Sequence, residues 1–224
     1  MQSSIKNFLK SLPPIHREGW PFVVIFLLAA LVLWQIWSFL GLLGFIATAW
    51  CAYFFRDPQR IIPERHNAIV SPADGKITAI TQVVPPAEMG LGKEKYTKIS
   101  IFLNIFNVHI NRAPCKGTIL SKFYVPGKFL NAELDKSSEQ NERMTWVLET
   151  NHTKIAFVQI AGMLAKRIVS WKNEGDTLEK GERFGLIRFG SRVDIYFPTQ
   201  ADVRVSLGQG VYGGETILAD LSQN

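Results

Sequence analysis

Cysteine is scarce in this chain of 224 residues, which contains only Cys51 and Cys115. Cys51 lies inside a long apolar tract and Cys115 far beyond it, so the two thiols occupy different physical environments. A disulfide framework or a cysteine-based zinc site needs several cysteines at short spacings, and both classes are therefore excluded. Repeats and low-complexity tracts are also lacking, so the length predicts one membrane element and one well-buried domain.

Charged side chains are absent from residues 20–55. A single α-helix of that length would extend about 54 Å, well beyond the ~30 Å hydrocarbon core of a bilayer. Two spans of about 18 residues fit better, and Gly41 and Gly44 would permit a tight reversal within residues 38–44. The sequence therefore predicts a helical hairpin. The tract is too long for the apolar part of a cleavable signal peptide.

Basic residues flank this tract on both sides. Those before it are Lys6, Lys10 and Arg17, and those after it are Arg56, Arg60 and Arg65. Because Lys and Arg are enriched in cytoplasmic flanks of membrane spans, both ends of the hairpin are expected in the cytoplasm. The predicted organisation is a cytoplasmic segment at 1–19, a membrane hairpin of two short helices at 20–55, a linker at 56–67 and a β-rich domain at 68–224.

The net charge of +6 suits an anionic partner. No aromatic-basic RNA motif or DNA-reading helix is recognisable, so a membrane surface or an acidic lipid is favoured over nucleic acid. Ordinary solvated surface charge remains an alternative reading of the same number.

Beyond the linker the chain is rich in short runs of Val, Ile, Phe and Thr, which favour strands. The predicted strands are Lys76–Val84, Lys98–Phe106, Thr118–Tyr124, Thr145–Glu149, Lys154–Ile160, Arg183–Phe189, Val193–Phe197 and Asp202–Leu207. The turns at 174–182 resemble those of lipoyl-type barrel-sandwich domains, which predicts a mainly β fold of that hybrid kind. The polar stretch 130–143 predicts a loop, either over the site or simply solvated.

One strand-like run near the C-terminus places a serine among apolar residues. Residues of one parity in 187–197 are apolar except Ser191, so this side chain is expected on the buried face. Gly190 before it has no Cβ and allows strained or closely approached backbone. The Gly190–Ser191 bond is therefore a candidate for internal cleavage, although this window alone also fits a core strand with a small residue at a bulge.

Three motifs together resemble a known enzyme family. They are Ser-Pro-Ala-Asp-Gly-Lys at 71–76, Asn-Val-His-Ile-Asn-Arg-Ala-Pro at 107–114 and Phe-Gly-Ser at 189–191, with further likeness at 49–58, 141–144 and 159–162. In this order they resemble the short bacterial form of the phosphatidylserine decarboxylases. The resemblance implies a lyase that cleaves itself between Gly190 and Ser191, remains a heterodimer of its two chains, and converts phosphatidylserine to phosphatidylethanolamine in the bacterial inner membrane, with its catalytic domain facing the cytoplasm.

The implied cofactor is a pyruvoyl group made from Ser191. Decarboxylation of an α-amino acid head group leaves a carbanion that needs a conjugated electron sink, and a pyruvoyl group supplies one without pyridoxal phosphate or a metal. Attack of the Ser191 hydroxyl on the Gly190 carbonyl would give an ester, and elimination followed by hydrolysis would leave the pyruvoyl group. The resemblance implies His109 as the base and Asp74 as the residue that orients it.

The chain departs from the family pattern at Phe106, where some members carry a second histidine. Its proton-transfer role would then fall to His109 or to water. Lys166, Arg167 and Lys76 are candidates for the lipid phosphate, but a solvated role fits them equally. Without the resemblance, Asp74 would be a turn former and His109 a structural residue.

Other functions fit parts of the sequence. A membrane-anchored lipoyl-like adaptor would give Ser191 no chemical role. A serine hydrolase would use the same three residues, but the Gly-x-Ser-x-Gly elbow is missing around Ser191. An ether lipid with a serine head group is an alternative substrate, and a higher homo-oligomer remains open.

Overall fold

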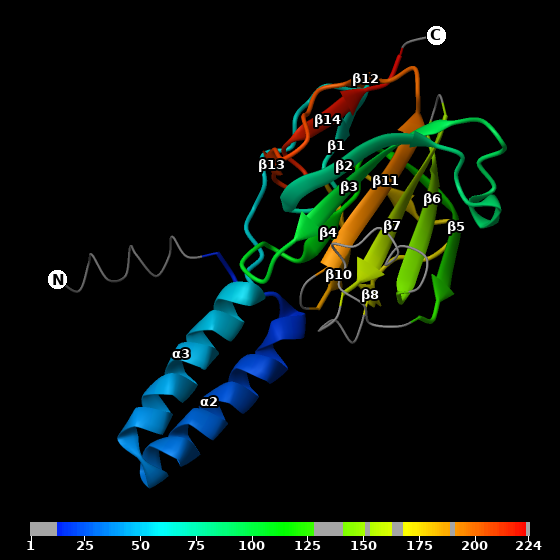
Figure 1. Ribbon diagram of the computed structural model, residues 1–224. Helices are drawn as coiled ribbons and strands as arrows, with labels where there is room; N and C mark the ends of the chain where they lie inside the picture. Colours follow the sequence, from blue (N-terminus) through cyan, green and yellow to red (C-terminus); the bar gives the residue numbers. More distant parts are fainter. Residues whose placement is uncertain (1–12, 128–140, 151–152, 163–167, 189–190, 223–224) are drawn as a thin grey trace. The chain divides into compact units, whose positions relative to one another are not determined.

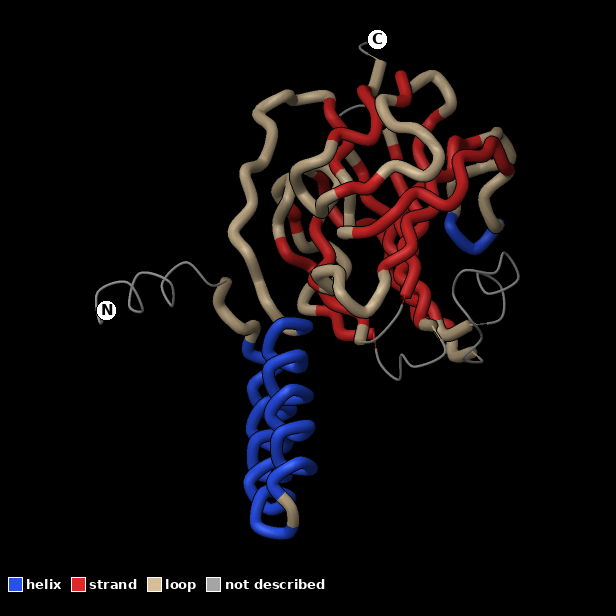
Figure 2. The backbone as a smooth tube through the Cα atoms, turned by 60° about the vertical axis from the view of Figure 1, so that its left-hand side comes forward, coloured by secondary structure: helices blue, strands red, loops and turns tan. Residues whose placement is uncertain are grey.

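The structure, a computed structural model, describes residues 13–127, 141–150, 153–162, 168–188 and 191–222. The chain forms two compact units, Met1–Gln59 and Arg60–Asn224, so the boundary falls inside the predicted linker. The described part of the first unit is helical and that of the second is built mainly of strands (Figures 1 and 2).

The first unit is a helical hairpin. A 3-10 turn, η1 (Arg17–Gly19), leads into α2 (Trp20–Ile36), and α3 (Ser38–Phe54) returns beside it. Pro21 suits the first turn of α2, because proline lacks the N–H that would be unpaired there. Each helix has 17 residues, which gives a length of about 26 Å, close to the ~30 Å hydrocarbon core.

The reversal between the helices lies at Trp37, whose backbone is extended with φ −158° and ψ 125°. The prediction that Gly41 and Gly44 form this turn is wrong. Both glycines lie inside α3, where an added Cβ would collide with Trp34 and Ala30 of α2, respectively. Their small size instead lets the two helix backbones approach closely, as small residues do between packed apolar helices.

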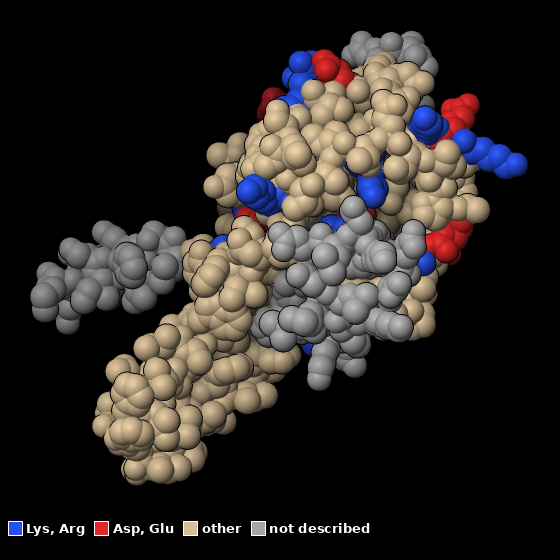
Figure 3. Space-filling model, viewed as in Figure 1, with Lys and Arg blue, Asp and Glu red and all other residues tan. Residues whose placement is uncertain are grey.

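The outside of the hairpin is apolar. The stretch Arg17–Ile36 is long and apolar enough to cross a membrane, and α3 is a shorter apolar helix. Figure 3 shows no charged side chain on the visible face of the two helices. Large side chains such as Ile25 and Ile36 are exposed, an arrangement that suits a lipid environment better than water.

The described part of the second unit contains fourteen strands. They are β1 (Ala68–Val70), β2 (Gly75–Val83), β3 (Tyr96–Leu103), β4 (Ile110–Arg112), β5 (Gly117–Val125), β6 (Arg143–Glu149), β7 (Lys154–Ala161), β8 (Ile168–Ser170), β9 (Thr177–Leu178), β10 (Arg183–Ile187), β11 (Ser191–Pro198), β12 (Asp202–Val203), β13 (Gly210–Val211) and β14 (Ile217–Asp220), with a 3-10 turn, η2 (Ala87–Met89), before β3. The prediction of a mainly β fold is confirmed.

The strands pair in antiparallel order β13-β2-β3-β11-β7-β6-β5-β9 in the largest sheet, with smaller sheets β4-β10-β8 and β1-β14-β12. Register shifts in β2 and β5 mark bulges, which bend strands and increase their twist (Figure 1). The sheet β4-β10-β8 packs on the largest sheet through Phe184, whose ring lies 5.1 Å from Trp146 and 4.9 Å from Phe157. The main core fills this interface.

Three predicted strands end earlier than expected. The run predicted at 98–106 stops at Leu103, and that at 202–207 is reduced to β12. The strand predicted at 183–189 ends at Ile187, and the apolar alternation of 187–197 crosses from β10 in one sheet to β11, which begins at Ser191 in another. An apolar alternation cannot reveal that the chain changes sheets within it.

Both faces of β11 are buried, but they differ in chemistry. Ser191 and Val193 face the main core, whereas Arg192 and Asp194 lie on the opposite face. There the Arg192 guanidinium donates to both carboxylate oxygens of Asp194 at 2.8 and 2.9 Å, and the two side chains are only 2% and 1% exposed. Breaking such a pair leaves a buried charge without compensation.

We expect Asp194→Asn to lower the free energy of unfolding by about 3–5 kcal/mol, because Arg192 would keep its charge in a buried site. Denaturant titration of the detergent-solubilised chain measures this. The control is Asp202→Asn, since the Asp202–Arg204 pair is 63% and 46% exposed and should contribute less than about 1 kcal/mol. Equal losses for the two variants would contradict the assigned role of burial.

Candidate active site

Ser191 begins the central strand β11, between Leu103 of β3 and Ala161 of β7. Its side chain is fully buried on the side of the main core, as its parity predicts. Within the described part of the chain its hydroxyl has no hydrogen-bond partner. Leaving a buried polar group unpaired costs about 1–3 kcal/mol, so this hydroxyl is a candidate for a chemical role. Gly190 lies outside the described residues.

His109 comes just before β4 and is also buried. Its Nδ1 lies 3.0 Å from the main-chain oxygen of Asn107. Because a carbonyl oxygen can only accept, Nδ1 carries the proton of this contact, and in the neutral ring Nε2 is then the basic nitrogen. This is the tautomer that a general base needs, and the Asn107 carbonyl supports it.

Asp74 lies at the start of β2 and is buried. Its Oδ1 accepts from the backbone N–H of Gly213 at 2.7 Å. Arg60 donates through Nη2 to Oδ1 and Oδ2 at 2.9 and 2.7 Å. Asp74 is therefore held in one orientation by a cation and a backbone amide.

Arg60 is a site residue that sequence reasoning missed, because it was read only as a basic flank of the apolar tract. Its side chain is 9% exposed, and Nη1 also lies 3.4 Å from Oε2 of Glu215. The other oxygen of Glu215 accepts from the N–H of Ile61 at 2.9 Å. No local pattern links Arg60 to Asp74 or Glu215, since only the fold brings them together.

The strand registers bring the three predicted segments to one end of the largest sheet. Bonds from Val70 N to Pro114 O and from Arg112 N to Pro72 O run antiparallel, so the segment that leads to Asp74 lies beside the segment that follows His109. On the other side, Lys76 pairs with Phe102, one residue before the partner of Ser191.

The backbone of His109 is also hydrogen-bonded to β10, the strand before Ser191 in the sequence. Its carbonyl accepts from the N–H of Ile187, the last residue of β10, at 3.2 Å. Ile187 lies four positions before Ser191. The structure therefore places the His109 segment beside the end of β10.

A buried relay of polar side chains lies deeper in the same interior. Trp146 Nε1 donates to Gln159 Oε1 at 2.9 Å, and Gln159 Nε2 donates to Asn111 Oδ1 at 2.8 Å. Because an indole N–H can only donate, it sets the orientation of both amides. The Asn111 NH₂ is left buried without a partner among the described residues. Asn111 belongs to the 107–114 motif, although only His109 was singled out there.

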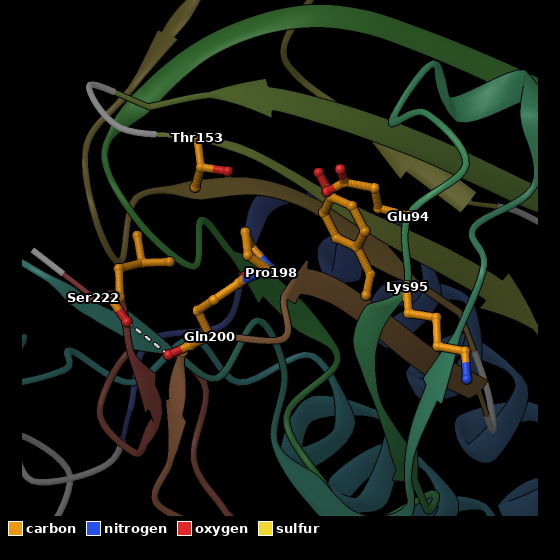
Figure 4. A pocket seen from close by; sticks show the side chains of 9 residues that line it. Glu94, Lys95, Thr153, Pro198, Gln200 and Ser222 are labelled. Atoms are coloured by element: carbon orange, nitrogen blue, oxygen red, sulfur yellow. Dashed lines mark hydrogen bonds between the residues drawn. The ribbon is translucent and has the colours of Figure 1, made fainter. Parts of the chain in front are cut away.

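The pocket in Figure 4 is not part of this arrangement. It has a volume of about 350 Å³ and is lined by residues that include Thr153, Pro198 and Gln200. Pro198 is the last residue of β11, about 23 Å along the strand from Ser191. The pocket therefore lies at the opposite end of the sheet.

Two further predicted site residues lie near the same end of the sheet but are exposed. Lys76 is exposed on β2, and Phe106 is 58% exposed in the turn after β3. Lys166, Arg167 and residues 130–140 of the predicted loop lie outside the described residues. Among the residues that are described, no group of three or more His, Cys, Asp or Glu is placed to hold a metal ion.

Comparison with known families gives a match over most of the chain. The family model described as Phosphatidylserine decarboxylase matches residues 47–219. The matched region includes Asp74, His109 and Ser191, as well as Arg60 and Asn111.

We expect Arg60 and Asp74 to be energetically coupled, because the guanidinium contacts both carboxylate oxygens in a buried setting. In a double-mutant cycle, Arg60→Gln and Asp74→Asn should show a coupling free energy of about 1–3 kcal/mol. Arg65→Gln is the control, because this arginine is 52% exposed and pairs with Asp220 instead. Its effect should add to that of Asp74→Asn within about 0.5 kcal/mol. Additive effects of Arg60→Gln would contradict the coupling.

Proposed function

Because the chain belongs to the phosphatidylserine decarboxylase family and is therefore a carboxy-lyase acting on phosphatidylserine, we propose that it works through a pyruvoyl group made from its own Ser191. The observation that carries the proposal is the fully buried Ser191 hydroxyl, which has no partner among the described residues at the first position of the central strand. The buried hydroxyls of Ser100 and Thr145 are also without a partner in the described part of the chain, so the proposal depends on the position of Ser191 directly after Gly190, at the predicted cleavage bond.

Self-cleavage would convert this serine in balanced steps. The Ser191 Oγ attacks the carbonyl carbon of Gly190, the peptide C–N bond breaks, and an ester forms with a free amino group on Ser191. Loss of the Ser191 α-proton then breaks the Cβ–Oγ bond and releases Gly190 as a carboxylate. The remaining enamine tautomerises to an imine, and water hydrolyses it with release of ammonia to leave the pyruvoyl group.

We assign to His109 the role of base in this attack. Its Nδ1 proton is held by the Asn107 carbonyl, which leaves Nε2 to accept the proton of the serine hydroxyl. Asp74 would stabilise the imidazolium through its charge, and Arg60 and the Gly213 amide keep its carboxylate in place.

The two chains would stay together after cleavage. The new C-terminal chain would begin with β11, which is hydrogen-bonded along its length to β3 and β7 of the N-terminal chain. Its buried face also contributes Val193, Ile195 and Phe197 to the main core. Separation would expose this core, so a stable heterodimer is expected.

In the decarboxylation itself, a pyruvoyl group at position 191 supplies the electron sink that is conjugated to the substrate amine. Strands β3 and β7 flank this position and Ser191 is fully buried between them, so these strands would limit the access of water to the group. Phe106 has no titratable group, so we assign movement of the proton to His109 or to a water molecule.

We further propose that α2 and α3 form an inner-membrane hairpin with the catalytic unit in the cytoplasm. Support comes from the apolar stretch Arg17–Ile36, from the adjacent apolar α3 and from the basic residues on both flanks. This location would keep the enzyme in the membrane that contains its lipid substrate.

The proposal predicts that Ser191→Ala yields a single uncut chain of 25.3 kDa without decarboxylase activity. Alanine has neither the hydroxyl for attack nor a leaving group for elimination. A denaturing gel and an assay of phosphatidylserine turnover measure both effects. Ser100→Ala is the matched control, because Ser100 is a buried serine on the neighbouring strand β3 and should leave cleavage intact. A Ser191→Ala protein that still decarboxylates phosphatidylserine would refute the cofactor assignment.

His109→Ala should slow self-cleavage by about 10²–10⁴-fold, the usual contribution of a general base. The cleavage rate must be followed in the folded, detergent-solubilised fraction, so that loss of folding is not mistaken for loss of catalysis. His66→Ala provides the comparison, since His66 is exposed and its variant should cleave at the normal rate. Normal cleavage by folded His109→Ala would remove His109 from the processing step.

A further inference from the structure

The turn that joins β3 to β4 exposes two apolar side chains. Ile105 is 37% exposed and Phe106 is 58% exposed, whereas Leu103 before them is fully buried. Among the exposed large hydrophobic residues of the described part of 60–224, these two alone are neighbours in the sequence. We call Ile105 and Phe106 the apolar tip.

The turn that carries the apolar tip is held by its own polar side chains. Asn107 Oδ1 accepts from the N–H of Asn104 at 2.9 Å, and Asn104 Oδ1 accepts from the N–H of Phe106 at 2.8 Å. The N–H of Asn107 also donates to the Asn104 carbonyl at 3.0 Å. The exposure of the two apolar residues therefore belongs to an ordered turn.

The apolar tip lies at the reacting end of the sheet. It begins two residues after Leu103, the β3 partner of Ser191, and ends three residues before His109. Tyr212, which is 59% exposed, lies near the same end, where its ring is 5.6 Å from the Arg60 guanidinium. Val84 lies at the other end, because it follows the end of β2 that pairs with Tyr96, which in turn pairs with Pro198 at the far end of β11.

We propose that the apolar tip inserts into the surface of the lipid bilayer and so brings the Ser191 end of the sheet to the membrane. This inference rests on the proposed function, because it takes Ser191 as the reacting position. The substrate's acyl chains favour the bilayer, while its head group must reach a fully buried residue. Two apolar side chains on the turn that follows the β3 partner of Ser191 would be stabilised on entering the acyl region.

A comparison of two substrates tests this. Phe106→Ser should be cleaved normally and should lose about tenfold in kcat/KM toward phosphatidylserine in vesicles, the size expected for a phenyl ring that is no longer buried. Toward a short-chain phosphatidylserine kept below its micelle concentration, kcat/KM should stay unchanged. Val84→Ser, at the opposite end of the sheet and 54% exposed, should match the wild type on both substrates.

The outcomes separate this inference from the proposed function. An unchanged rate of Phe106→Ser on vesicles, or an equal loss on both substrates, would overturn the membrane role of the apolar tip. Failure of the wild-type chain to cleave itself, or activity that survives in Ser191→Ala, would instead overturn the proposed function.

A fluorophore at position 106 gives a direct measure of insertion. Both native cysteines are buried, and burial raises the pKa of the Cys115 thiol to about 12, so a label will favour an introduced cysteine. In vesicles whose acyl chains carry bromine, a label on Phe106→Cys should be quenched and one on Val84→Cys should not. Equal quenching at both positions would contradict the inference. Shielding of the label at position 106 from water that increases with the protein-to-lipid ratio would also contradict the inference. That result would indicate contact between copies of the chain.

Discussion

The double pairing of β11 determines where Ser191, the proposed reacting residue, lies. Hydrogen-bonded ladders to β3 and β7 hold Ser191 level with Leu103 and Ala161. A slip of one residue would turn every side chain of β11 to the other face. It would bring Arg192 and Asp194 into the main core and move Ser191 out of it. The register is therefore a condition for the packing and for the proposed chemistry.

The buried ion pair of Arg192 and Asp194 helps to enforce this register. Such pairs contribute little net stability compared with apolar residues of similar size, because both charges lose their hydration. Misplaced in the main core, the same two charges would be far more costly. Val193, Ile195 and Phe197 favour the same register from the other face. The apolar and the charged residues of β11 thus favour the same orientation, in which Ser191 faces the main core.

Most polar groups near Ser191 are held in one orientation by hydrogen bonds. Arg60 and the Gly213 amide orient Asp74, the Asn107 carbonyl supports one tautomer of His109, and Trp146 sets the direction of the Gln159–Asn111 relay. The Ser191 hydroxyl, the Asn111 NH₂ and Nε of Arg60 have no hydrogen-bond partner among the described residues. Unpaired buried groups weaken a fold, and Ser100 and Thr145 carry such groups as well.

The sequence predicts those features that follow from local pattern. The alternation of apolar residues located most strands and the buried face of Ser191, and the uncharged tract located the two helices. The helix break at Trp37 was not predicted, because glycine was taken as a turn former when its small size instead serves helix packing. Arg60 and the Trp146–Gln159–Asn111 relay were also missed. These contacts join residues far apart in the chain, and no periodicity encodes them.

The central claim is that Ser191 becomes a pyruvoyl group, and the intact mass of the C-terminal fragment tests it most directly. The account predicts a fragment of residues 191–224 that is lighter by one molecule of ammonia than the same fragment with serine at its N-terminus. A fragment with an intact N-terminal serine, or an active protein that remains a single chain, would contradict the account.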